Sequence, residues 1–174
     1  MGYARYHYSK CQLGLPDGIH IIDKSSPKRL QQVVDDMGHY SAVTQGIDTR
    51  VTSIYKLKDP KLHAKIFLLV HEGNPIGILT TTIRTFEDGI LLWFDDFYIM
   101  QPYQRKGFGT TLYEFALKYR NAEPCDFFYD RPSFKLTNFL KKRGINTSKP
   151  NDVESLKRAG QAAYAWMNNQ KANE

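Results

Sequence analysis

The residues best suited to chemistry lie in a strand-like stretch, Asp96–Ile99, and in the glycine-bearing loop Gln104–Thr110 that follows it. This order predicts a loop that presents successive backbone N–H groups to a phosphate, with the positive end of a helix dipole behind them. Gly107 and Gly109 leave room for a pyrophosphate close to the backbone, because neither has a side chain. A Gly-x-Gly pair alone also occurs in ordinary turns, but the spacing Gln-x-x-Gly-x-Gly directly after a strand is more specific.

The loop resembles the acetyl-CoA pyrophosphate loop of GNAT acetyltransferases, whose pattern is Gln/Arg-x-x-Gly-x-Gly/Ala. A narrower resemblance, to the α-tubulin N-acetyltransferases, rests on three further segments: Asp96-Phe97-Tyr98-Ile99; Asp130-Arg131-Pro132-Ser133 with Lys135-Leu136 and Phe139-Leu140; and Ser41-Ala42-Val43-Thr44-Gln45 followed by Val51-Thr52-Ser53. The resemblance covers roughly His20 to Ile145.

The resemblance implies a GNAT fold of the α/β (α+β) class, in which helices flank a central mixed β-sheet. It implies transfer of an acetyl group from acetyl-CoA, used as a co-substrate, to a lysine side chain of α-tubulin in microtubules. The implied location is the cytoplasm and the microtubule cytoskeleton, including the cilium or axoneme. We expect a monomer without a nucleic-acid, membrane or metal partner. Two alternatives stay open: a divergent, low-activity module that binds acetyl-CoA or microtubules, and a GNAT enzyme that acts on another amine.

Acetyl transfer to an amine needs a cofactor cradle, a donor to the thioester oxygen, a base for the ammonium and a slot that orients the lysine. By resemblance, the backbone of Phe97–Ile99 holds the pantetheine arm and polarises the thioester. The residues expected to contact acetyl-CoA are Phe97, Tyr98, Ile99, Gln104, Arg105, Lys106, Gly107, Phe108, Gly109, Thr110, Ser133, Lys135, Asn138 and Lys142. Alternatively, Lys135, Lys141 and Lys142 form a solvated helix face.

The resemblance places a catalytic base at Asp130, at the end of the apolar run Asp126–Tyr129. Because Asp130 precedes Arg-Pro-Ser, it is alternatively the cap of the next helix. Gln45 matches a family glutamine at the end of the first helix, near the substrate groove. An isolated glutamine there would otherwise be interpreted as a surface residue.

Trp93 stands where many members of the family have a cysteine that is thought to help deprotonate the lysine. An indole has no basic atom for this purpose. Asp95 lies two residues further on, so we expect it on the same strand face and in a partial catalytic role, while Asp96 points the other way. Alternatively, Trp93 is a core or groove aromatic and Asp95 an exposed strand residue.

The elements that must position these residues are indicated by hydrophobic periodicity and by turn residues. We first expect a strand at His20–Asp23 and a helix from an N-cap at Ser26 to about Thr44. A meander of three strands follows, at Lys65–Val70, Ile76–Arg84 and Ile90–Ile99. The last expected elements are a helix at Thr110–Tyr119, a strand at Cys125–Tyr129 and a helix from Ser133 or Phe134 to Lys142, stopped by Gly144. The strands joined by the helix at Thr110–Tyr119 favour local parallel pairing, which lets the sheet open into a cleft.

A chain of 174 residues suits one domain. We assign residues 1–145 to the acetyltransferase domain, with the motifs in 20–145, and residues 146–174 to a divergent polar segment that is helical and packs on or trails the domain. Asp152 is a candidate cap for that helix. The family closes its sheet here with an apolar strand, for which Tyr164–Met167 is the only candidate substitute.

Charge and cysteine content narrow the class further. The net charge of +6, from 24 basic and 18 acidic residues, favours an anionic partner without saying which one. Cys11 and Cys125 are far apart, so we expect a reducing compartment rather than a disulfide framework. The five histidines are scattered and indicate no zinc site. No apolar run is long enough to cross a membrane.

Overall fold

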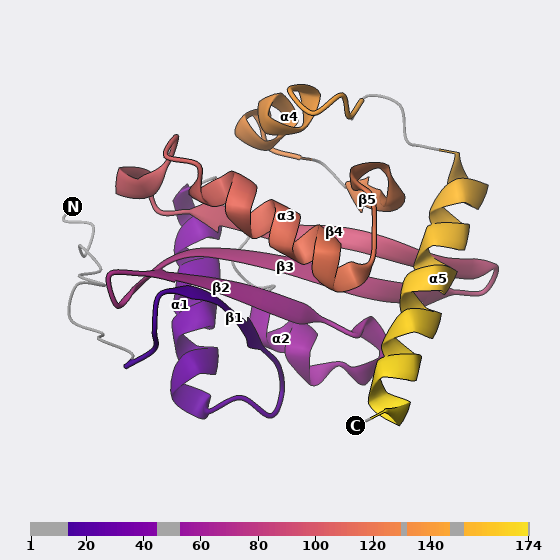
Figure 1. Cartoon of the computed structure of the whole chain (residues 1–174), viewed down its shortest axis with the longest axis horizontal. Helices are drawn as coiled ribbons and strands as arrows, with labels where there is room; N and C mark the ends of the chain where they lie inside the picture. Colours follow the sequence, from indigo (N-terminus) through magenta and orange to yellow (C-terminus); the bar gives the residue numbers. More distant parts are fainter. Residues whose placement is uncertain (1–13, 45–52, 130–131, 147–151, 174) are drawn as a thin grey trace.

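The computed structural model of the chain describes residues 14–44, 53–129, 132–146 and 152–173. Cys11, Gln45 and Asp130 therefore lie outside the described residues. Within these ranges one mixed sheet has the strand order β1 (Gly18–Ile22), β2 (Lys65–His71), β3 (Asn74–Phe86), β4 (Gly89–Ile99) and β5 (Phe127–Tyr129) (Figure 1). The described α-helices are α1 (Lys28–Thr44), α2 (Ser53–Lys58), α3 (Phe108–Arg120), α4 (Phe134–Lys141) and α5 (Val153–Ala172).

The sheet combines an antiparallel meander with one parallel pair. Strands β1 to β4 pair antiparallel in chain order, and for β2 to β4 this confirms the meander that the tight turns of the sequence predict. Strand β5 pairs parallel with β4, from Leu92 opposite Phe127 to Phe94 opposite Tyr129. The predicted mixed sheet and its local parallel pair are therefore confirmed. Among the described strands, the pairing of β4 with β5 ends at Phe94, and β4 continues to Ile99.

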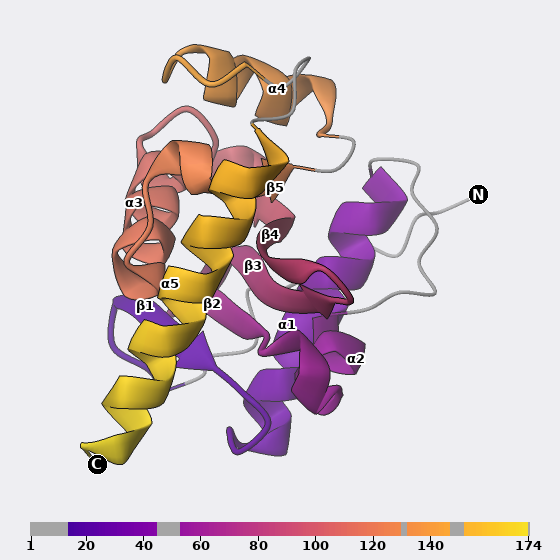
Figure 2. The ribbon, with the colours of Figure 1, turned by 90° about the vertical axis from the view of Figure 1, so that its right-hand side faces the viewer.

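Helices cover both faces of the sheet because alternate strand residues point to opposite sides. On one face, Val33, Val34 and Met37 of α1 pack with Leu57 of α2 against residues such as Ile78. On the other face, α3, α4 and α5 pack against a larger core of Phe67, Leu79, Ile83, Leu92, Phe94, Leu112, Tyr113, Ala116, Leu140 and Ala163. Figure 2 shows the sheet between α1 and α2 on one side and α3 and α5 on the other.

A β-bulge interrupts the pairing of β3 with β4. Leu79 is opposite Phe97 and Thr81 is opposite Phe94, so Asp95 and Asp96 together face the single residue Thr80. One extra residue in a strand reverses the alternation of the side chains after it. As a result, the rings of Phe94 and Phe97 lie on the same face, with centroids 5.8 Å apart.

The C-terminal segment is a helix that packs on the sheet. The Asp152 carboxylate accepts a hydrogen bond from the Glu154 N–H and caps α5. Tyr164–Met167 lies inside α5 and forms no strand, because the buried residues Leu156, Gly160, Ala163 and Met167 recur at helical spacing. The helix crosses close to β4: a Cβ added to Gly160 would lie 2.2 Å from the Ile90 carbonyl oxygen.

Arg120 ties α3 to its neighbours although its side chain is completely buried. Its guanidinium donates to the Thr81 hydroxyl at 2.8 Å and to the carbonyls of Thr81 and His63, and Nη1 lies 2.8 Å from the Met167 sulfur. Burial lowers the pKa of Arg120 to about 10, which still leaves it charged at neutral pH. These contacts join α3, β3 and α5.

Several expected boundaries differ from the structure by one or two residues, and three of them lie at the starts of α3, α1 and β5. Helix α3 begins at Phe108 rather than Thr110. Helix α1 begins at Lys28: the Pro27 carbonyl accepts from the Gln31 N–H, whereas the Ser26 hydroxyl accepts from the Asp23 N–H in the preceding turn. Strand β5 begins only at Phe127, because Pro124–Asp126 forms a 3-10 turn. In the described parts of the chain, no helix is long and apolar enough to span a membrane.

Candidate active site

The loop between β4 and α3 has the backbone of an anion cradle. After the turn Gln101–Tyr103, Arg105 and Gly107 have positive φ values of 62° and 88°. Gly107 is the N-cap of α3 and has no side chain to cap the helix. Because the first intrahelical bond runs from the Thr111 N–H to the Gly107 carbonyl, the N–H groups of the preceding helical residues have no intrahelical acceptor. An anion fits this position.

The two glycines of the loop have different structural roles. A Cβ on Gly107 would meet nothing within 4 Å, but its backbone conformation disfavours any L side chain. A Cβ on Gly109 would lie 3.4 Å from the Phe97 ring and 3.7 Å from the Ile99 side chain. A Cβ at Gly109 would thus make ordinary van der Waals contacts, and only a larger side chain would disturb the packing of α3 on β4. Its expected role toward the pyrophosphate stays a prediction.

The second predicted cofactor segment meets this loop in space. Gln104 donates from Nε2 to the Ile99 carbonyl at 2.7 Å, and Lys135 Nζ lies 3.5 Å from Gln104 Oε1. Ser133 caps α4 by accepting from the Leu136 N–H. The structure thus brings α4 beside the end of β4, although the two segments lie about thirty residues apart in the chain.

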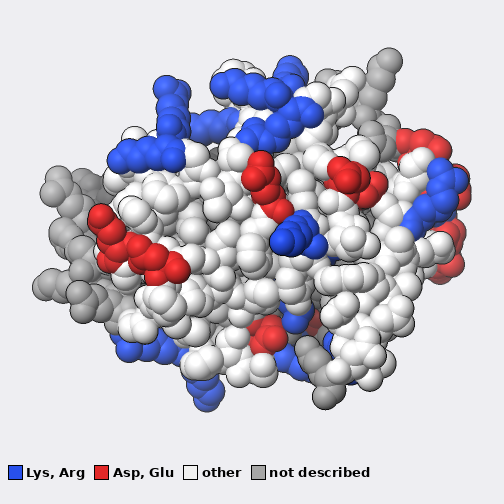
Figure 3. Space-filling view, in the orientation of Figure 1, with Lys and Arg blue, Asp and Glu red and all other residues white. Residues whose placement is uncertain are grey.

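Basic side chains gather over these two segments. Figure 3 shows Lys and Arg side chains clustered over α4 and the start of α3. The exposed residues that contribute are Arg105, Lys106, Lys135, Lys141 and Lys142, and Asn138 is exposed on the same helix. An anionic ligand at the N-terminus of α3 would therefore enter a positive field.

Arg143 is a residue of this region that the sequence analysis missed. Its guanidinium lies 3.5 Å from the centroid of the Phe139 ring and donates to the Phe139 carbonyl. It also donates to the Thr110 hydroxyl at 2.5 Å, which joins the end of α4 to the first turn of α3. A run of three basic residues, Lys141 to Arg143, gives no sign of which one turns inward.

The carboxylates at the β4 bulge are already engaged. Asp95 accepts from Arg84 Nη2 and from the Thr82 hydroxyl, each at 2.7 Å. Lys56 Nζ lies 2.9 Å from Asp96 Oδ2 and 3.4 Å from Asp95 Oδ1. The expectation that Asp96 points away from Asp95 is therefore wrong, because the bulge brings both carboxylates to one ammonium. A catalytic role for Asp95 stays a prediction.

Trp93 lies in an aromatic group of β3, β4 and β5 residues. Its ring centroid is 4.3 Å from that of Phe128 and 6.4 Å from that of Phe86. The Arg84 guanidinium lies 4.3 Å from the indole centroid. These contacts favour the interpretation of Trp93 as a packing aromatic.

The hydroxyls of Tyr113 and Tyr129 stay protonated at neutral pH. The Tyr129 hydroxyl is 2.8 Å from that of Tyr113, and burial raises the pKa of both groups. Burial also raises the pKa of the Cys125 thiol, which disfavours the nucleophilic thiolate. Among the described residues, no three His, Cys, Asp or Glu side chains are placed to hold a metal ion.

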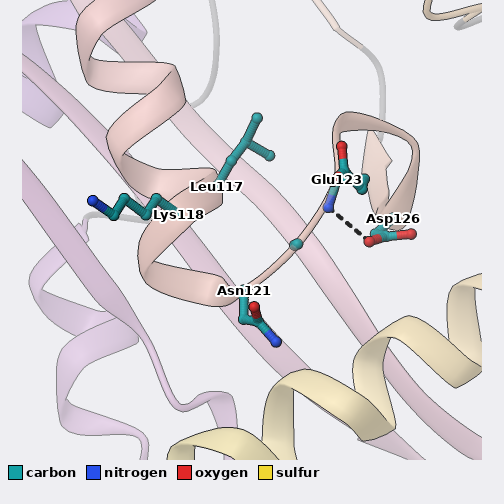
Figure 4. A pocket seen from close by; sticks show the side chains of 6 residues that line it. Leu117, Lys118, Asn121, Glu123 and Asp126 are labelled. Atoms are coloured by element: carbon teal, nitrogen blue, oxygen red, sulfur yellow. Dashed lines mark hydrogen bonds between the residues drawn. The ribbon is translucent and has the colours of Figure 1, made fainter.

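A surface pocket lies elsewhere, at the C-terminal end of α3 (Figure 4). It is lined by Leu117, Lys118, Asn121, Ala122, Glu123 and Asp126, and the Glu123 N–H donates to the Asp126 carboxylate across it. The 13 residues of α3 separate it from Gly107 by about 20 Å. This pocket is therefore separate from the loop Gln104–Thr110 and the first turn of α3.

Comparisons with known proteins agree with this arrangement. A family described as "GNAT acetyltransferase, Mec-17" matches residues 87–148. The crystal structure of a predicted acetyltransferase with acetyl-CoA from Clostridium acetobutylicum superposes with a TM-score of 0.55 at 12% identity, over 74% of this chain and 90% of that one. At this identity, the likeness supports the GNAT fold alone, and the predicted fold class is confirmed.

Sequence relatives are more specific. The α-tubulin N-acetyltransferase of Plasmodium knowlesi (strain H) is 32% identical over 128 residues, which cover 69% of this chain and 68% of that protein. The α-tubulin N-acetyltransferase 2 of Trypanosoma cruzi (strain CL Brener) is 29% identical over 75% of this chain and 47% of its own length. This chain spans about half the length of several relatives that it matches. It belongs to the α-tubulin N-acetyltransferase family of GNAT acetyltransferases.

Proposed function

We propose that this chain transfers an acetyl group from acetyl-CoA to a lysine side chain of α-tubulin in microtubules. The observation that carries the proposal is the N-terminus of α3, which has no side-chain cap, beside the end of β4 at Phe97 and Ile99. Family membership supplies the substrate class, because the relatives are named for α-tubulin. The same argument supports a place of action on the microtubule cytoskeleton in the cytoplasm.

The geometry supports different roles for the loop Gln104–Thr110, for α4 and for the end of β4. The pyrophosphate would lie at the first turn of α3, beneath the basic side chains of the loop and α4. The pantetheine arm would extend along the backbone of Phe97–Ile99, as an added strand would, and a backbone N–H there would polarise the thioester carbonyl. Gln104 braces the end of β4 for this role through its bond to the Ile99 carbonyl.

In the proposed reaction, the lysine ammonium loses one proton, and the resulting amine attacks the thioester carbonyl carbon. The C–S bond then breaks, and the second proton of the nitrogen passes to the CoA sulfur, which leaves as the thiol. Asp130 would accept the first proton directly or through a water molecule, and Gln45 would orient the substrate loop. The Tyr113 and Tyr129 hydroxyls bond to each other, Tyr129 also donates to the Pro124 carbonyl, and burial raises the pKa of both, so neither acts as the base.

The test is acetylation of polymerised tubulin by the purified chain, followed with an antibody against the acetylated lysine, with acetyl-CoA binding measured separately by calorimetry. Product that depends on both acetyl-CoA and enzyme supports the proposal. Binding of acetyl-CoA without turnover on tubulin would instead support a binding module. Turnover on other amines, with tubulin unmodified, would support a GNAT enzyme of different specificity.

A further inference from the structure

The bulge in β4 turns two consecutive carboxylates toward one cation. In a regular strand, Asp95 and Asp96 would point to opposite faces. Because both residues face the single residue Thr80, the alternation is broken at this point. Lys56 Nζ contacts Asp96 at 2.9 Å and Asp95 at 3.4 Å, so one ammonium holds both carboxylates of the bulge.

The centre of this cluster is buried, and its described members are two cations and two carboxylates. The side chains of Lys56 and Asp95 are 8% and 7% exposed, and that of Asp96 is 33% exposed. Arg84 is the second cation, bound to Asp95 at 2.7 Å. A buried pair of this kind contributes less to net stability than to a fixed geometry, because desolvation offsets most of the attraction.

The position of the cluster links it to the cofactor strand. The bulge immediately precedes Phe97–Ile99, the backbone assigned to the pantetheine arm. It also brings Phe97 to the face where α3 packs, so that Gly109 lies against the Phe97 ring. Lys56 reaches the bulge from the opposite face, on α2, 40 residues earlier in the chain.

We propose that Lys56 is a positioning residue for acetyl transfer, which fixes the bulge at Asp95–Asp96 and thereby the direction of the Phe97–Ile99 backbone beside the thioester. It touches neither substrate, and acts through the two carboxylates from the face of the sheet that carries α1 and α2. This inference rests on the proposed function for the reaction, but its geometric part is measurable without turnover.

The first measurement compares the variants Lys56→Met and Lys58→Met in the full chain. Met keeps most of the length of the side chain and removes the charge, and the exposed Lys58 on the same helix is the matched control. We expect the backbone amide NMR signals of Phe97–Ile99 to shift in Lys56→Met and to stay in place in Lys58→Met. Unchanged signals in a folded Lys56→Met protein would overturn the proposal, whether or not the wild type acetylates tubulin.

The second measurement is kinetic. A misplaced strand should lower kcat in Lys56→Met by about tenfold to a hundredfold. The dissociation constant for acetyl-CoA should change little, because the cradle on α3 is intact. Lys56→Arg, which keeps the charge, should recover most of kcat. Wild-type kcat in Lys56→Met contradicts the positioning role, whereas absence of turnover in the wild type contradicts the proposed function alone.

A double variant separates positioning from charge balance. Lys56→Met with Asp96→Asn removes one buried cation and one anion together, so we expect the melting temperature to recover relative to Lys56→Met. The kcat should stay low, because no cation on α2 then holds the bulge, and Asp95 keeps only its contacts with Arg84 and Thr82. If both recover together, Lys56 only compensates charge and the proposal fails.

Discussion

The Arg84 guanidinium lies 4.3 Å from the Trp93 ring centroid while its Nη2 donates to Asp95 at 2.7 Å. The Arg84 side chain thus contacts both Trp93, which stands where many family members have a cysteine, and Asp95, the carboxylate expected to take over part of the role of that cysteine. The Asp95 oxygens are engaged by Arg84, Thr82 and Lys56. We therefore expect Asp95 to act mainly as an anchor for this part of the sheet.

Replacing Trp93 by cysteine tests whether a thiol at this position restores a route for the proton. We expect Trp93→Cys to raise turnover at mildly basic pH, because a thiol with a pKa near 8.5 begins to ionise there and an indole does not. The variant should also melt at a lower temperature, because Arg84 and Phe128 lose the ring they contact. The measurement is the pH–rate profile on polymerised tubulin. Trp93→Ser leaves a similar gap without an ionising thiol, and identical profiles for the two variants would refute the thiol route.

Replacing Gly107 by valine should abolish acetyl-CoA binding. A bulky side chain there would project over the first turn of α3, where the pyrophosphate is expected. Gly73→Val is the matched control, since Gly73 also has a positive φ and open space at its Cβ but lies in the turn between β2 and β3. Both variants should lose stability to a similar extent, and calorimetry should detect lost affinity only in Gly107→Val. Equal affinities would place the pyrophosphate elsewhere. Gly109 is a poorer test, because its Cβ would enter the packing against Phe97.

Asp130→Asn should bind acetyl-CoA normally and lose turnover by about a hundredfold to ten-thousandfold, as expected when a general base is removed. Because Ser133 is the N-cap of α4, the capping alternative for Asp130 does not apply to this helix. Asp130→Ser also removes the carboxylate, so both variants should be impaired on tubulin to a similar extent if Asp130 is the base. Wild-type activity in either variant would show that this carboxylate takes no part in the proton transfer.

Gly160→Ala should destabilise the protein, against the usual preference of helices for alanine by about 1 kcal/mol. The reason is steric: the added Cβ would lie 2.2 Å from the Ile90 carbonyl oxygen and force α5 away from β4. The measurement is the melting temperature. The reverse change at an exposed site of α5, Ala162→Gly, should lower it through helix propensity alone. An increase in melting temperature in Gly160→Ala would show that α5 does not pack as closely as described.

His63 should make the attachment of α5 sensitive to acid. Burial, and then the nearby charges of Lys171 and Arg120, lower the pKa of His63 below its usual value. The unfolded chain therefore takes up a proton at higher pH than the folded chain. The stabilisation is present above a pH of about 6.5 and is lost as the pH falls through the lower folded value.

The measurement is the melting temperature of wild type and His63→Asn between neutral pH and pH 5. Asparagine tolerates the left-handed backbone of His63, which has a φ of 42°. We expect a shallower decline in the variant, and parallel curves would contradict a contribution from His63.

Local patterns predicted much of the fold because their physical causes are local. The β-branched residues of Ile76–Arg84 and the turn at Glu87–Gly89 predicted β3 and β4 within a few residues. The glycine loop before α3 followed from the spacing Gln104-x-x-Gly107, and the structure adds that Gly107 has a positive φ. The loop and the strand that meet at the candidate site could therefore be found from the residues alone.

Tertiary structure decided the relationships that depend on distant residues. The alternation rule placed Asp96 on the wrong face, because a bulge adds one residue to the count and leaves no mark in the pattern. The partners of the bulge and of the cradle, Lys56 and Arg143, lie 40 and 33 residues from the groups they bind. A basic residue in a sequence carries no sign of which acid or hydroxyl it will meet, since that depends on how the elements pack. The inward face of α5 was likewise set by contact with β4, where only Gly160 lets the two backbones approach so closely.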